Sequence, residues 1–274
     1  MSQLVYFSSA GSSGANQTLD NTYDSIGFGT NGDGTLVTAD AAGNAKGSFV
    51  SLGTAAADWA GFFLWVGTST SSATKYLVDV RAGLSTVIAP NLYVHTGSTT
   101  AWRPIYIPLN VTSATELFAA IQANSTGGQS LRFGIIGVRR NSQSPPLFSS
   151  MVALSADTAN TRASTIDVPL TDVWTQQIAS TSAAYAALMV MTGMGASNPA
   201  TAQSASVSLG TGGSGSEAAF YQYPVVANTT DPRLPGGFSG LIERAIPAGT
   251  RLSAKIKAAT TGDNFRVGLY GLVA

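Results

Sequence analysis

The chain has 274 residues, no cysteine and one histidine, and its 14 basic residues balance its 14 acidic residues. This neutrality argues against binding to nucleic acid or to an anionic membrane surface, because both need an excess of Lys and Arg. The lack of cysteine excludes disulfides and thiolate metal sites. Charged residues form only 10% of the chain, against roughly 25% in an average soluble domain. So little charge gives weak protection against self-association and suits a protein that assembles.

No segment of the sequence predicts a membrane anchor or a secretion signal. The longest apolar stretch, Ala183 to Met191, is far shorter than the roughly 20 residues that a spanning helix needs. The first residues lack the basic segment and the apolar core of a signal peptide. We therefore expect synthesis in the cytoplasm without export by the classical secretion route.

The two halves of the chain repeat each other. The segment Trp59-Ala-Gly-Phe-Phe-Leu-Trp-Val-Gly67 matches Tyr185-Ala-Ala-Leu-Met-Val-Met-Thr-Gly193, and Arg132-Phe-Gly-Ile-Ile-Gly137 matches Arg266-Val-Gly-Leu-Tyr-Gly271. Residues 76–80 match residues 205–209 more loosely, and residues 117–123 match residues 252–258. Four matches in the same order indicate an internal duplication.

Each repeat is predicted to be a β-sandwich of around eight short strands. Apolar residues alternate at period two in residues 117–123 and 252–258, and clusters of Gly, Asn, Ser and Pro separate the strand-like runs. Such a pattern without a βαβ rhythm is typical of a jelly roll or a related Greek-key sandwich. The predicted fold class is therefore all-β, with tandem duplicated jelly-roll-like β-sandwiches and an N-terminal arm.

The domain boundaries follow from composition. Residues 1–140 are predicted to hold the arm, about residues 1–45 with an outer strand or two, and the first sandwich. Residues 141–150 form the linker, because Pro145 and Pro146 follow a polar run and cannot continue a central strand. Residues 151–274 form the second sandwich. In an assembly we expect the arm to lie across a neighbouring subunit.

No group of residues predicts catalysis, a metal or a cofactor. His95 has no Gly-x-Ser-x-Gly elbow to act with and no counterpart in the second repeat. Glu116, Glu217 and Glu243 are the only glutamates, and we interpret them as loop acids, although two of them would suffice for a glycosidase. The segment Asn31-Gly-Asp33-Gly-Thr35 lacks the closing glutamate of a calcium loop and predicts a turn. The glycine-rich residues 210–216 lack the Gly-Lys-Ser/Thr of a phosphate loop and predict a hairpin loop.

One aromatic residue is a candidate ligand contact. Trp59 and Trp65 lie in the apolar segment matched by Tyr185 and Met191, which predicts that both tryptophans belong to the core. Trp102 lies in a polar stretch instead, and an exposed indole there would stack on a sugar ring or contact a partner. Trp102 is therefore the candidate site residue for a glycan or partner.

The whole chain resembles structural proteins of tailed-bacteriophage virions. The resemblance rests on the cysteine-free chain rich in Gly, Ser, Thr and Ala, on the duplicated β unit and on the Ile246-Pro-Ala-Gly-Thr-Arg-Leu-Ser-Ala-Lys255 turn. Head decoration or cement proteins, head fibres and tail-associated β-sandwich proteins share these features. The resemblance implies location in a virion, self-association as a homo-oligomer, with a trimer as the expected state, and contact with the major capsid protein. A carbohydrate- or receptor-binding tail or fibre protein is the alternative, followed by a glycosidase or lyase.

Overall fold

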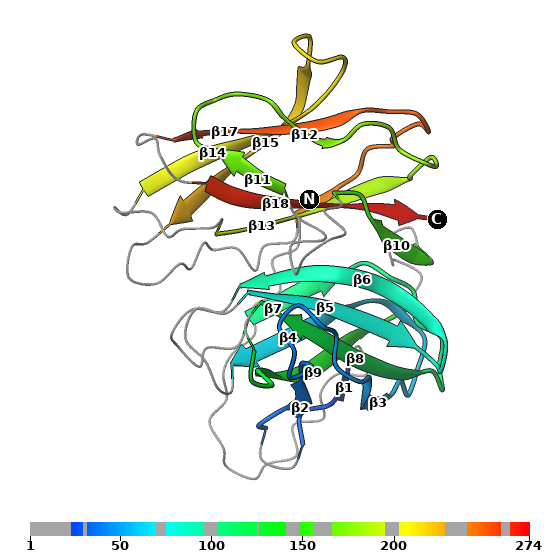
Figure 1. Cartoon of the computed structure of the whole chain (residues 1–274). Helices are drawn as coiled ribbons and strands as arrows, with labels where there is room; N and C mark the ends of the chain where they lie inside the picture. The colour runs from blue at the N-terminus through cyan, green and yellow to red at the C-terminus, as the bar shows by residue number, and fades with distance from the viewer. Residues whose placement is uncertain are drawn as a thin grey trace.

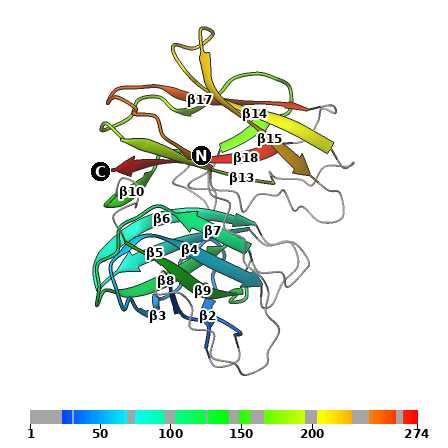
Figure 2. The same ribbon diagram turned by 180° about the vertical axis from the view of Figure 1, so that it is seen from behind.

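The structure is a computed structural model, which describes residues 23–29, 32–68, 75–95, 103–124, 126–140, 148–155, 166–194, 203–227, 240–258 and 264–274. Those residues form β-strands, turns and loops, and they contain no helix, so none is long and apolar enough to cross a membrane. Figure 1 shows the strands arranged as two stacked sandwiches, and Figure 2 shows the same arrangement from behind. The all-β prediction is confirmed.

The first sandwich consists of two antiparallel sheets. One sheet has the order β1-β9-β4-β7, and β2 follows β1 along the same edge of β9. The other has the order β3-β8-β5-β6. The strands are β1 (Tyr23–Ile26), β2 (Thr35–Thr38), β3 (Val50–Thr54), β4 (Trp59–Thr68), β5 (Lys75–Ala82), β6 (Thr86–His95), β7 (Arg103–Ile107), β8 (Glu116–Ala123) and β9 (Ser130–Arg139).

The second sandwich repeats this topology strand for strand. Its sheets have the orders β10-β18-β13-β16, with β11 also on β18, and β12-β17-β14-β15. The strands are β10 (Ser150–Ala153), β11 (Ile166–Pro169), β12 (Thr175–Ile178), β13 (Ala187–Met194), β14 (Gln203–Thr211), β15 (Ala218–Ala227), β16 (Gly240–Ile242), β17 (Leu252–Ala258) and β18 (Asn264–Val273). Because β1 and β2, like β10 and β11, share one sheet position, each sandwich has the eight positions of a jelly roll.

The duplication extends to the residue register. β3 has a β-bulge between Ser51 and Gly53 where it pairs with β8, and β12 has the equivalent bulge between Gln176 and Ile178 where it pairs with β17. The turn that precedes β8 places Ala114 at φ 63°, and the matching turn before β17 places Gly249 at φ 78°. The left-handed backbone region suits glycine and costs an alanine roughly 1–2 kcal/mol. Both repeats therefore keep the same turn, although only the second repeat has a glycine at the left-handed position.

Two glycines explain the repeated Arg-x-Gly-x-x-Gly pattern. A Cβ atom added to Gly137 would lie 2.1 Å from the Trp59 ring, and one added to Gly271 would lie 2.4 Å from the Tyr185 ring. Both rings are buried, Trp59 completely and Tyr185 at 3% exposure. Each glycine of a central strand thus makes room for one large aromatic side chain in its own sandwich.

The structure corrects the placement of Trp65. Trp59 belongs to the core, but Trp65 is half-buried and lies outside the core clusters. The register of β4 against β9 shifts between Trp59 and Gly61. A bulge adds one residue and so changes which side chains face inward. Phe62, Leu64 and Val66 consequently face the core, and Trp65 faces outward.

The segments proposed as arm and linker fall largely outside the described residues. Residues 1–22 and 141–147 are not described. Within the segment expected to hold the arm and an outer strand or two, β1 and β2 both pair with β9. After residues 141–147, Phe148 forms a parallel bridge with Leu109, and β10 begins at Ser150. The boundaries at residues 45, 140 and 150 stay predictions.

The two sandwiches meet at a buried seam. The seam is the contact of edge strand β6 with the outer face of the sheet formed by β10, β13 and β18 (Figure 1), in which Tyr270 is the β18 residue that bonds to β6. Residues of the second sandwich that belong to the core cluster of the first are Met151, Ala187, Met189, Met191, Tyr270 and Leu272. The Tyr270 hydroxyl accepts a hydrogen bond from the Tyr93 N–H (3.0 Å) and donates one to the Asn91 carbonyl (2.9 Å). The Arg266 guanidinium lies 6.0 Å from the Tyr93 ring centroid.

We expect Gly137→Ala and Gly271→Ala each to destabilise the protein by about 1–3 kcal/mol, because a methyl group would overlap Trp59 or Tyr185. Urea unfolding followed by tryptophan fluorescence measures the change. Gly213→Ala is the control, since its nearest neighbour is the Ser216 hydroxyl at 3.2 Å in an exposed loop. Equal effects at all three positions would contradict this account of the glycines.

We expect Tyr270→Phe to destabilise the protein by about 1–3 kcal/mol, because it leaves the buried Tyr93 N–H without its acceptor. Differential scanning calorimetry of the full chain measures the loss. Tyr221→Phe is the matched control, because Tyr221 is half-buried at the far edge of the second sandwich. If Tyr270→Phe is as stable as the control, the hydroxyl does not hold the seam.

Candidate functional site

The ligand contact expected from the sequence, Trp102, lies outside the described residues. His95 is the last residue of β6 and is paired in the ladder with Lys75. Its repeat position on β15 carries no histidine. Among the described residues there is no group of three or more His, Cys, Asp or Glu side chains that could hold a metal ion.

Two of the three glutamates have structural partners. Glu116 accepts a hydrogen bond from the Ser51 hydroxyl at 2.5 Å, across the β3–β8 pair. Glu217 forms an ion pair with Arg251 at 2.6 Å. Glu243 is exposed and follows β16, where it lines two hollows of the surface. It is therefore the glutamate placed for contact with a ligand or a partner.

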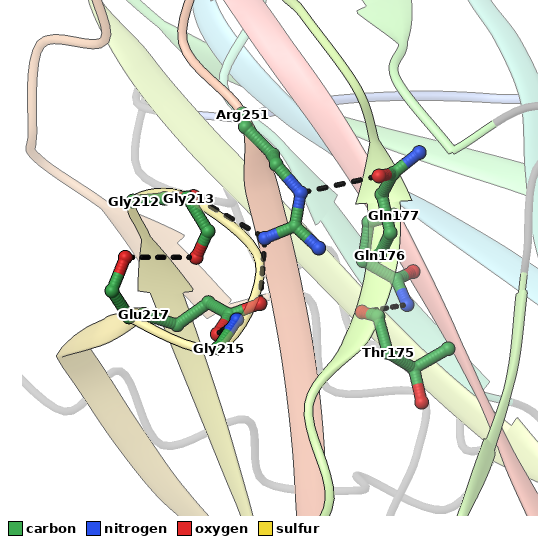
Figure 3. Close-up of polar contacts among 9 residues, drawn as sticks. Thr175, Gln176, Gln177, Gly212, Gly213, Gly215, Glu217 and Arg251 are labelled. Atoms are coloured by element: carbon green, nitrogen blue, oxygen red, sulfur yellow. Dashed lines mark hydrogen bonds and ion pairs between the residues drawn. The ribbon is translucent and has the colours of Figure 1, made fainter.

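The glycine-rich hairpin between β14 and β15 is closed by its own Glu217 and by Arg251 from the segment before β17 (Figure 3). Arg251, just before β17, donates to the Gly212 carbonyl (3.2 Å), to Glu217 and to the Gln176 side chain. The hydrogen bond from Arg251 lowers the pKa of Glu217. The second Glu217 oxygen accepts the Gly215 N–H at 2.8 Å. A backbone N–H that a phosphate loop would offer to an anion is thus bound by the loop's own carboxylate.

The Asp33 region is also a closed turn. The Gly34 N–H donates to the Phe28 carbonyl at 3.1 Å. The Arg132 guanidinium donates to the carbonyls of Asp33 (3.4 Å) and Gly34 (3.1 Å). A guanidinium therefore occupies the carbonyl oxygens that a calcium ion would need.

A partly buried ion pair fixes β1 to the first sandwich. The Asp24 carboxylate accepts hydrogen bonds from Trp59 Nε1 at 2.7 Å and from Arg139 Nε at 2.8 Å. Burial by itself raises the pKa of Asp24, but the bonds from Trp59 and Arg139 and the Arg139 charge outweigh burial and lower the pKa below its usual value. The ionised carboxylate consequently favours the folded state.

This ion pair predicts loss of stability in acid. A carboxyl group with a lowered folded pKa stabilises the protein fully above its unfolded pKa of about 3.9, and the stabilisation disappears as the pH falls through the folded pKa. We expect Asp24→Asn to lower the unfolding free energy by about 2 kcal/mol at neutral pH and by less near pH 2.5. Urea unfolding at both pH values measures this. Asp33→Asn is the control, because Asp33 is exposed. If Asp24→Asn lowers the unfolding free energy equally at both pH values, the ionised Asp24 carboxylate does not stabilise the fold.

A concave surface lies at the open edge of the second sandwich. We call it the edge groove. It has a volume of about 560 Å³, and its lining residues come from β15 and from β16 and the two residues after it: Phe220, Tyr221, Leu241, Ile242, Glu243 and Arg244. The Arg244 guanidinium stacks 4.5 Å from the Phe220 ring centroid. The groove therefore combines aromatic rings with one negative and one positive charge.

A smaller hollow, the junction pocket, lies beside the edge groove and shares Leu241 and Glu243 with it. The pocket has a volume of about 360 Å³, and its other lining residues come from both sandwiches and the segment between them: Tyr106, Pro108, Phe148, Ala186 and Ala187. Burial raises the pKa of Tyr106, so its hydroxyl stays protonated at neutral pH. Volumes of this order are within the range of ligand pockets.

No protein-family model matches the chain, and no curated protein matches its sequence. Several solved structures are distantly similar to the chain. The cryo-EM structure of Broad Bean Stain Virus is 9% identical, with a TM-score of 0.35 over 92% of this chain and 88% of that one. PNGF-II is 10% identical, with a TM-score of 0.40 over 93% and 61% of the chains. The STIV MCP is 11% identical, with a TM-score of 0.33 over 87% and 96%. These identities and TM-scores are too low to indicate a function.

Sequence reasoning missed the groove and the pocket. The residues of the pocket come from segments more than a hundred positions apart, as Tyr106 and Leu241 show. Those of the groove come from two neighbouring strands, β15 and β16, whose contact the sequence does not mark. One signal was available, because Glu243 has no counterpart at its repeat position, which is occupied by Pro108. A position that differs between two copies of one unit is a candidate for a role that the copies do not share.

Proposed function

We propose that the chain is a non-catalytic structural protein of a virus particle. Its specific role is that of a capsid decoration or cement protein, or a minor capsid protein, of a bacteriophage. It stabilises or extends the particle through contacts with other copies and with the major capsid protein. Jelly rolls are a recurrent architecture of viral capsid proteins, although a fold by itself does not define a function.

One observation carries the proposal: the chain contains two copies of the same jelly roll, and the seam holds them in one fixed arrangement. The seam buries Met189, Met191 and Tyr270 with at most 1% exposure. A hydroxyl bonded to two backbone groups adds a directional contact to this apolar packing. A single chain therefore presents two equivalent units in a constant relation, which suits a protein that bridges two positions of a repeating lattice.

A second candidate function is carbohydrate binding, which the lining of the two hollows favours. Glu243 lies beside the aromatic rings of Tyr106 and Phe148 in the junction pocket and of Tyr221 in the edge groove. Rings that face a sugar and a carboxylate that accepts its hydroxyl hydrogen bonds form a common glycan site. Trp102 stays the sequence-based candidate for the same role.

Purification of particles from the producing cells tests the structural role. We expect the chain to copurify with capsids or tails at a constant ratio to the major capsid protein, measured by quantitative peptide mass spectrometry and cryo-electron microscopy. Recovery solely as a free protein would overturn the proposal. Binding on a glycan array that is lost in Trp102→Ala or Glu243→Gln, together with absence from particles, would favour the second candidate.

A further inference from the structure

The seam joins two kinds of surface, and the duplication provides each kind a second time. In the seam, edge strand β6 contacts β10 and β13, and Tyr270 of β18 bonds to the β6 backbone. The repeat equivalent of β6 is β15, and the equivalents of β10, β13 and β18 are β1, β4 and β9. One chain therefore carries, outside its own seam, one further edge and one further outer face of the same kinds.

The outer face of the first sandwich is apolar and half-buried. Register pairs place its residues at the positions that form the seam in the second sandwich: Phe63 corresponds to Met189, Trp65 to Met191, and Ile136 to Tyr270. Val138 corresponds in the same way to Leu272, and Tyr23 to Met151. The five seam residues are buried, with exposures of 0–3%. Their five equivalents are half-buried, although they are apolar or aromatic.

Residues of edge strand β15 are more exposed than their equivalents in β6. Leu92 and Tyr93 of β6 are buried in the seam, at 0% and 2% exposure. Register pairs place Tyr223 and Pro224 of β15 at these two positions. Tyr223 is half-buried and Pro224 is exposed. The edge groove lies between β15 and β16, on the side of the second sandwich that corresponds to the covered side of the first.

Edge strand β15 and the outer face of the first sandwich match each other chemically. In the seam, the Tyr93 N–H donates to the Tyr270 hydroxyl. The equivalent of Tyr93 is Pro224, which has no N–H, and the equivalent of Tyr270 is Ile136, which has no hydroxyl. Donor and acceptor are thus both absent from the second pair. A contact between Ile136 and Pro224 is therefore apolar and leaves no backbone N–H at position 224 without an acceptor.

We propose that a second copy of this chain docks on β15 and the edge groove with the outer face of its first sandwich, and so repeats the internal seam between molecules. This inference rests on the proposed function as an assembling protein and names the surfaces of its self-association. The two surfaces differ, so the contact is head-to-tail. A head-to-tail contact builds a ring if its rotation closes and a strand of subunits if it does not.

Single-surface variants test the proposal in sedimentation velocity runs across a concentration series. Trp65→Glu blocks the outer face, and Pro224→Glu blocks the edge. We expect each variant to associate on the order of thirtyfold more weakly than the unchanged chain, which corresponds to the loss of one central contact. An equimolar mixture of the two variants should form dimers and nothing larger, because each variant retains one intact surface.

Val173→Glu is the matched control, because Val173 is 58% exposed in a loop outside both surfaces, and it should associate like the unchanged chain. Ile136→Asp is the second outer-face variant if Trp65→Glu unfolds. A monomer at every concentration, or equal association of both blocked variants and the control, would overturn the inference. Recovery in particles without head-to-tail association would overturn this inference alone, whereas head-to-tail association of a chain absent from particles would count against the proposed function.

Discussion

The arrangement of the two sandwiches depends on how Tyr270 meets the backbone of β6. One hydroxyl satisfies a backbone N–H and a backbone carbonyl of an edge strand, where both groups would otherwise be buried without partners. The geometry requires a local distortion of β6, which has Asn91 at φ 51°. The Asp79 carboxylate accepts the Asn91 N–H at 2.7 Å and forms an ion pair with Lys46 at 2.6 Å. Charged residues of the first sandwich thereby shape the surface that receives the second.

The two copies of the unit have kept their interior and changed their exterior. Inside each sandwich, a glycine packs against an aromatic ring at the same position. The ring is that of Trp59 beside Gly137 in the first copy and that of Tyr185 beside Gly271 in the second. Outside, equivalent positions carry different chemistry: Ile136 stands where Tyr270 stands, and Pro224 where Tyr93 stands. Interior positions are constrained by close packing within one sandwich. Exterior positions are constrained by what packs against each sandwich, and the packing partners of the two sandwiches differ.

Much of the fold was predictable because the repeat is visible in the sequence. The glycines of the Arg-x-Gly-x-x-Gly pattern mark the central strands β9 and β18, and the alternation in residues 117–123 and 252–258 marks β8 and β17. Trp65 was wrongly assigned to the core, because the bulge after Trp59 reverses which side chains face inward. No residue type in the sequence predicts this bulge. The seam and the junction pocket could not be predicted, since they depend on how strands far apart in the sequence meet.

Strand order also governs when each part of the molecule is able to form during synthesis. β9 is paired with β1, β2 and β4, so the first sandwich stays incomplete until a strand more than a hundred residues after β1 has left the ribosome. β18 has the same place in the second sandwich and carries Tyr270 as well. Such long-range pairing makes folding slow and leaves apolar sheet faces uncovered in the meantime. The nascent chain therefore leaves Met189 and Met191 of β13 uncovered until β18 pairs with β13 and the first sandwich packs on that face of the sheet.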